Sequence, residues 1–188
     1  KVPRKGLVGA WGHCYPWASN TGLDWAFEEV RWWSHWLKGE PTGIMDEPML
    51  RVFMPYATVA RAAPDPVPGR WIAEPAWPGP QQPGRVMRLN AGGLLSDLPG
   101  SAETAALPGD RLVGLANPAQ WWLCIPADQA RDDERSLVFD TPPLEEDLEI
   151  LGMPEARLVL SADRPAAHAA ARLCAVAPDG SSWLVTYA

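Results

Sequence analysis

Near the start of the chain, the segment Leu7-Val8-Gly9-Ala10-Trp11-Gly12-His13-Cys14-Tyr15-Pro16 joins a short apolar run to a histidine and a proline. Its apolar beginning predicts a short buried strand over residues 6–11, and Pro16 predicts a turn after it. Open α/β folds place their chemistry in loops at the carboxyl ends of such strands. Because imidazole exchanges protons near neutral pH, His13 is the first candidate for a general base. The alternative is a loop histidine that only caps the end of a strand.

The segment 24–38 predicts the one long helix of the chain. A stripe of apolar residues recurs there at helical spacing: Ala26, Val30, Trp33 and Leu37. Polar residues occupy the opposite face, which we expect to be solvated: Asp24, Glu28, Arg31 and His35. Thr21 supplies an N-cap signal, and Gly39 followed by Pro41 is expected to end the helix. We expect the apolar stripe to bury itself against the β-rich part of the chain or against another copy.

Beyond residue 46 the residue pattern changes from helical spacing to short strand-like runs separated by turn signals. The expected strands cover residues 49–54, 70–73, 85–89, 136–139, 157–161, 171–176 and 183–187. Pro178-Asp179-Gly180 predicts a hairpin turn between the last two, because proline presets φ and glycine permits positive φ. Many short strands, with 21 prolines and 16 glycines in the chain, favour a mainly β fold of β-sandwich or jelly-roll type.

Charge and cysteine usage exclude several classes of function. The formal net charge is -7, and without a basic cluster this argues against nucleic acid and anionic membranes as partners. No apolar run approaches the roughly 20 residues of a membrane-spanning helix. The chain begins with Lys1 instead of methionine and without a signal peptide, so we expect its true start upstream. Cys14, Cys124 and Cys174 are widely spaced, which predicts free thiols in a reducing, cytoplasmic compartment.

No other motif competes with His13 for a catalytic role. His35 is expected to be a solvated helix residue, and His168 a loop residue. Runs of like charge are usually solvated, so the carboxylates of residues 128–134 and 145–149 are expected in solvated loops. A calcium site is the weaker alternative, because these carboxylates share no helical face and lack the spacing of metal ligands. Gly92-Gly93 lacks the flanking residues of a phosphate-binding loop, and no G-x-S-x-G elbow occurs in the chain. The sequence therefore predicts neither a metal nor a cofactor.

Three segments together resemble the CocE/NonD hydrolases, the family of cocaine esterase and X-Pro dipeptidyl-peptidase. They are Gly9-Ala-Trp-Gly-His13, the helix segment 27–39 with its Trp-Trp-x-x-Trp-Leu-Lys-Gly pattern, and residues 42–54. Weaker similarity continues through residues 135–144, 148–152 and 176–181. The resemblance implies the last strand and helix of an α/β-hydrolase domain over residues 1–44. It also implies a galactose-binding-like jelly roll over residues 45–188, which we expect to be truncated.

The resemblance implies Ser-His-Asp catalysis on ester or amide substrates, acyl or X-Pro, with His13 as the catalytic histidine. The family's serine and acid precede this element, so we expect both outside these 188 residues and the isolated chain to be inactive. The alternative is a non-catalytic jelly-roll module that binds carbohydrate, buttresses a domain or mediates oligomers. The expected partners are a small ester, amide or peptide substrate, the hydrolase domain, or a second copy. Four tryptophans are candidates for stacking on sugars or for packing between sheets: Trp71, Trp77, Trp121 and Trp122.

Overall fold

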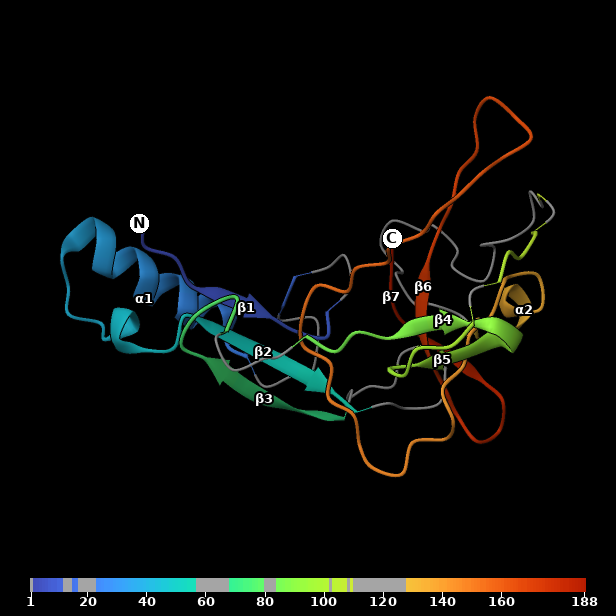
Figure 1. Ribbon diagram of the computed structural model, residues 1–188. Helices are drawn as coiled ribbons and strands as arrows, with labels where there is room; N and C mark the ends of the chain where they lie inside the picture. Colours follow the sequence, from blue (N-terminus) through green and yellow to red (C-terminus); the bar gives the residue numbers. More distant parts are fainter. Residues whose placement is uncertain are drawn as a thin grey trace. The chain divides into compact units, whose positions relative to one another are not determined.

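A computed structural model of the chain describes most of its residues (Figure 1). The described residues are 2–11, 15–16, 23–56, 68–79, 84–101, 103–107, 109 and 128–188. Those up to residue 79 belong to one compact unit, and those from residue 84 onward belong to a second. Three small β-sheets account for all the strands of this described part, and helix is scarce, which confirms the mainly β prediction.

The first unit is organised around a three-stranded sheet of order β1-β2-β3. Its strands are β1 (Gly6–Val8), β2 (Leu50–Pro55) and β3 (Gly69–Glu74). Strand β1 runs parallel to β2, and β3 runs antiparallel to it. The predicted strands at 49–54 and 70–73 are confirmed, whereas the first strand ends earlier than expected, at Val8. The buried apolar side chains of the described residues all belong to this unit: Ile44, Leu50, Val52 and Phe53.

Helix α1 (Trp25–Lys38) confirms the predicted helix within one residue of its expected start. Its N-cap is Asp24, whose Oδ1 accepts a hydrogen bond of 3.0 Å from the backbone N–H of Phe27. Thr21, the expected cap, lies outside the described residues. Gly39 ends the helix in the left-handed region at φ 71°, and its N–H donates to the carbonyl of His35 at 3.1 Å. A short 3₁₀ helix, η2 (Ile44–Asp46), then leads toward β2.

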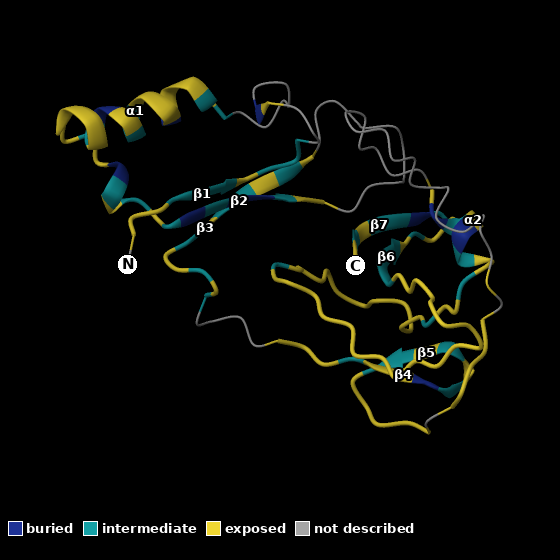
Figure 2. Cartoon of the chain, turned by 90° about the horizontal axis from the view of Figure 1, so that it is seen from above, coloured by how far each residue is buried: buried dark blue, intermediate teal, exposed yellow. Residues whose placement is uncertain are grey.

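The two faces of α1 are reversed relative to the expectation. The acidic residue Glu28 is buried at 9 % exposure, while Val30 and Leu37 are 63 % and 76 % exposed. Figure 2 shows most of the helix surface as exposed. The physical reason lies in the sheet, where Arg51 of β2 pairs with the Glu28 carboxylate. The prediction of a solvated polar face is therefore wrong, and no described part of the first unit covers the apolar stripe.

The second unit contains two antiparallel pairs and a short helix. Strands β4 (Arg88–Asn90) and β5 (Leu94–Ser96) are joined by the 3₁₀ turn η3 (Ala91–Gly93). Strands β6 (Arg172–Val176) and β7 (Ser182–Tyr187) form the predicted C-terminal hairpin. Helix α2 (Ala130–Asp133) falls in the predicted acidic loop. The sequence therefore located the hairpin correctly but missed β5 and α2.

The hairpin turn follows the chemistry that its sequence predicts. Asp179 Oδ1 accepts hydrogen bonds from the backbone N–H of Ser181 at 3.0 Å and from its hydroxyl at 2.7 Å. These bonds hold the pKa of the Asp179 carboxyl below its usual value. Gly180 takes φ 84°, a conformation that side chains disfavour. The turn is therefore built by one carboxylate and one glycine, as its Pro-Asp-Gly pattern indicates.

Two predicted strands are wrong. Residues 136–139 contain only loop, and the nearest pairing is a single parallel bridge between Leu94 and Asp140. Residues 157–161 are exposed and carry no ladder, because no neighbouring strand lies alongside them among the described residues. The predicted strand at 85–89 is formed only near its end, as β4. None of the described helices has both the length and the apolar character required to cross a membrane.

The capping bond of α1 gives a stability test. Replacing Asp24 by Ala removes the acceptor for the Phe27 N–H and is expected to cost about 1 kcal/mol in the free energy of unfolding. Asp24→Asn keeps an acceptor and should cost much less. Urea denaturation followed by tryptophan fluorescence measures the difference, since α1 carries four tryptophans: Trp25, Trp32, Trp33 and Trp36. Equal stability of the Ala and Asn variants would contradict the cap.

Candidate functional site

The predicted catalytic residue, His13, lies outside the described residues, as do Cys14 and Cys124. The structure does describe the segment that leads to it. Trp11, two positions before His13, packs its ring against Trp71 of β3 with 6.4 Å between centroids. Trp71 also meets Phe53 edge-on at 5.5 Å. These contacts favour the packing interpretation of Trp71 over stacking on a sugar.

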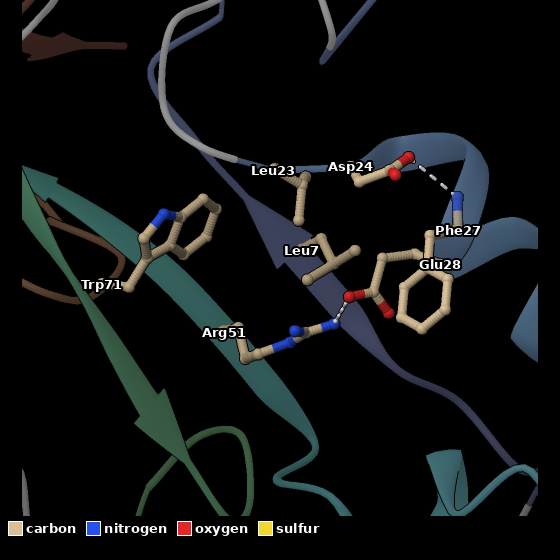
Figure 3. Close-up of a pocket in the computed structure, with 7 residues that line it drawn as sticks. All are labelled: Leu7, Leu23, Asp24, Phe27, Glu28, Arg51 and Trp71. Carbon is tan, nitrogen blue, oxygen red and sulfur yellow. Dashed lines mark hydrogen bonds and ion pairs between the residues drawn. The ribbon is translucent and has the colours of Figure 1, made fainter.

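A cavity of about 340 Å³ lies between the start of α1 and the sheet (Figure 3). Glu28 and Arg51 reach toward one another across it, and the Asp24 carboxylate bonds to the Phe27 amide at its rim. The lining is otherwise apolar or aromatic. The residues that line it are Leu7, Leu23, Asp24, Phe27, Glu28, Arg51 and Trp71. None of these seven offers a nucleophile, and both carboxylates are already engaged.

The buried Glu28 carboxylate is the electrostatic centre of this region. Arg51 NH2 lies 2.7 Å from Glu28 Oε1, and Arg31 NH1 lies 3.4 Å from Oε2. Glu47 in turn pairs with Arg31 and lies 3.8 Å from Arg51 NH2. A buried carboxylate is costly unless it is paired, so these arginines make the burial of Glu28 possible. The network therefore holds the polar face of α1 onto β2.

A lysine extends the network to the beginning of β1. The Lys5 ammonium donates to the Glu47 carbonyl, and it lies 3.4 Å from the carbonyls of Met45 and Pro48. Desolvation lowers the pKa of Lys5, and the Glu47 charge opposes that shift. The hydrogen bond from Arg31 to Glu47 raises the pKa of the Arg31 guanidinium. The segment before β2 therefore contacts both β1 and α1 through charged groups.

A second polar cluster lies in the other unit and centres on Arg172 of β6. Its NH1 donates to Gln129 Oε1 at 2.9 Å, and its NH2 donates to Asp133 Oδ1 at 2.9 Å and to Ser136 Oγ at 3.1 Å. Asp132, 4 % exposed, lies 3.8 Å from NH1. The acidic run expected in a solvated loop is thus partly buried. The sequence feature that could have indicated this buried cluster is Arg172, an arginine within an otherwise apolar strand.

The remaining candidates are two histidines and a cysteine, and of these Cys174 lies close enough to Arg172 and Asp133 to feel their charges. The His35 ring meets Trp36 edge-on at 4.8 Å, and His168 is exposed in a loop. Burial raises the pKa of the Cys174 thiol, and a hydrogen bond with Ser182 opposes the rise. Across the described ranges, the histidine, cysteine and acidic side chains form no group able to hold a metal ion.

Comparison with protein families decides the identity of most of the chain. The profile of the X-Pro dipeptidyl-peptidase C-terminal non-catalytic domain matches residues 42–188. The chain belongs to this family. The match begins after α1, so the X-Pro dipeptidyl-peptidase C-terminal domain includes Glu47, Arg51 and Arg172, whereas His13 and Glu28 precede it. No curated protein and no solved structure matches the chain.

The Arg172 cluster gives a stability test within the family domain. Arg172→Met removes the cation that pairs with Asp133 and lies beside the buried Asp132, and it should cost about 3 kcal/mol. Arg157→Met breaks the exposed pair between Arg157 and Glu155 and should change stability by less than about 0.5 kcal/mol. Chemical denaturation of both variants measures the contrast. Similar losses for the two would show that Arg172 is not a structural centre.

Proposed function

We propose that the chain is the C-terminal part of a serine hydrolase that acts on ester or amide substrates, acyl or X-Pro. The observation that carries the proposal is the family match over residues 42–188, directly preceded by the Trp-Gly-His13 element and the tryptophan-rich helix. On this proposal residues 1–44 end an α/β-hydrolase domain, and residues 45–188 form a galactose-binding-like jelly roll. The enzyme is cytoplasmic, consistent with its free thiol at Cys174.

In the proposed reaction His13 is the general base of a Ser-His-Asp triad. It accepts the serine hydroxyl proton as the serine oxygen attacks the substrate carbonyl, and it returns that proton to the departing alcohol or amine. Water then attacks the acyl-enzyme with the same assistance and releases the acid. The serine and the acid belong to sequence outside these 188 residues. The family domain carries no step of this chemistry, in agreement with its description as non-catalytic.

The exposed face of α1 supports contact with a catalytic domain. Four large apolar residues of this helix are about half exposed or more: Phe27, Val30, Trp33 and Leu37. A face of this kind is rarely left in water, and a C-terminal non-catalytic domain accompanies a catalytic one. We therefore assign the apolar face of α1 to the hydrolase domain of the same protein. Packing of this apolar face against the hydrolase domain would fix the position of α1, the helix that follows His13.

His13 is tested in the full-length protein. His13→Ala should lower kcat on 4-nitrophenyl acetate by at least about 10³-fold and abolish labelling of the serine by a fluorophosphonate probe. His168→Ala, in an exposed loop, is the matched control and should leave both unchanged. Unchanged circular dichroism would show that the fold is kept. A loss of less than tenfold for His13→Ala would refute the assignment.

The apolar face is tested in the isolated 188-residue chain. The chain should bind the dye 1-anilinonaphthalene-8-sulfonate, and Val30→Glu with Leu37→Glu should remove most of the fluorescence, because both residues are exposed on α1. Val159→Glu replaces a fully exposed apolar residue away from α1 and serves as control. A monodisperse chain that binds no dye would contradict the proposal, and a stable dimer would assign the face to a second copy.

A further inference from the structure

The segment just before and within β2 contacts both parts of the chain that flank His13. His13 lies five positions after Val8, the end of β1, and twelve before Trp25, the start of α1. On the first side, the parallel register places Leu7 opposite Arg51, and Gly6 N–H donates to the Met49 carbonyl at 2.8 Å. Lys5 adds its bonds to the carbonyls just before β2.

On the second side, the same segment holds α1 by its side chains. The Arg51 guanidinium pairs with Glu28 at 2.7 Å, and Glu47 pairs with Arg31. Arg51 is therefore a residue whose backbone lies in the ladder with β1 and whose side chain binds α1. Glu28 and Leu7 line the same cavity as Arg51, so the three groups converge at one place.

We propose that Arg51, with Glu28 as its partner on α1, is a positioning residue that holds the two flanks of His13 at a fixed separation. The inference rests on the proposed function. A chain segment held at both ends samples fewer conformations than one released at an end, and reaction rates are sensitive to displacements of about 1 Å in a catalytic group. Arg51 and Glu47 belong to the matched family domain, whereas Leu7, Glu28 and Arg31 precede it. The non-catalytic domain thereby supports catalysis without touching the substrate.

The burial of the pair explains why it can act as a positioning device. The Glu28 side chain is 10 % exposed and that of Arg51 is 30 % exposed, so water screens the pair less than it screens a surface ion pair. By comparison, Arg157 and Glu155 are also 2.7 Å apart but 86 % and 67 % exposed, and both lie on one loop. That pair connects no separate elements and provides a matched control.

The test is a double-mutant cycle in the full-length protein with 4-nitrophenyl acetate as substrate. Arg51→Met should lower kcat about tenfold with KM within twofold, and Arg51→Lys should restore most of the loss. In the His13→Ala background, Arg51→Met should change the residual rate by less than twofold, because a residue that acts through His13 has nothing left to position. Arg157→Met should be silent in both backgrounds.

Several outcomes overturn the inference. Equal losses from Arg51→Met with and without His13 would show a general structural role, and a kcat within twofold of wild type would show no role. Should Arg51→Met fail to fold, Glu28→Gln replaces it in the same cycle, with the same expected pattern and a smaller loss. Full activity of His13→Ala alone would refute the proposed function, and the inference with it. Failure of the proposed function is distinguishable from failure of the Arg51 inference alone, because the single variant His13→Ala reveals it without any change at Arg51.

Discussion

The structure of the first unit depends on the ion pair between Arg51 and Glu28. A charged residue in a strand must find a partner when a helix covers it, and α1 supplies the partner of Arg51, near the start of β2, from its own polar face. This requirement sets the rotation of the helix about its axis. Once Glu28 is turned toward β2, the apolar stripe on the opposite side of α1 has to face outward.

The rotation of α1 links the two halves of the proposed enzyme. One face of the helix is joined to the family domain through charged groups, and the other face is left apolar. Ion pairs are directional and position elements in one orientation, whereas apolar surface contributes most of the free energy of association. We interpret α1 as a connector that binds the non-catalytic domain through ion pairs and the hydrolase domain through its apolar face.

Much of the local structure could be predicted from the sequence, because local signals decide it. Gly39 ends the helix and Pro178-Asp179-Gly180 makes the hairpin turn, each through bonds within a few residues, whereas the N-cap at Asp24 was not predicted. The face of α1 could not be predicted, because Glu28 and Arg51 are distant in sequence. The strand expected at 157–161 failed for the same reason, since a ladder requires a neighbour that no local pattern reveals. Of the candidate site, the pattern indicates His13, but the clusters around Arg51 and Arg172 arise only from tertiary contacts.

The second unit differs from the first in what it buries. Among its described residues the most deeply buried side chains are polar, Gln129 and Ser182, at 0 % and 1 % exposure, and the buried apolar core belongs to the other unit. Exposure of apolar surface raises the heat capacity on unfolding, whereas exposure of polar surface lowers it. The second unit should therefore have a small heat-capacity change for its size and a flat dependence of stability on temperature. Hydrogen-bond geometry, more than the amount of apolar surface, would then keep its fold unique.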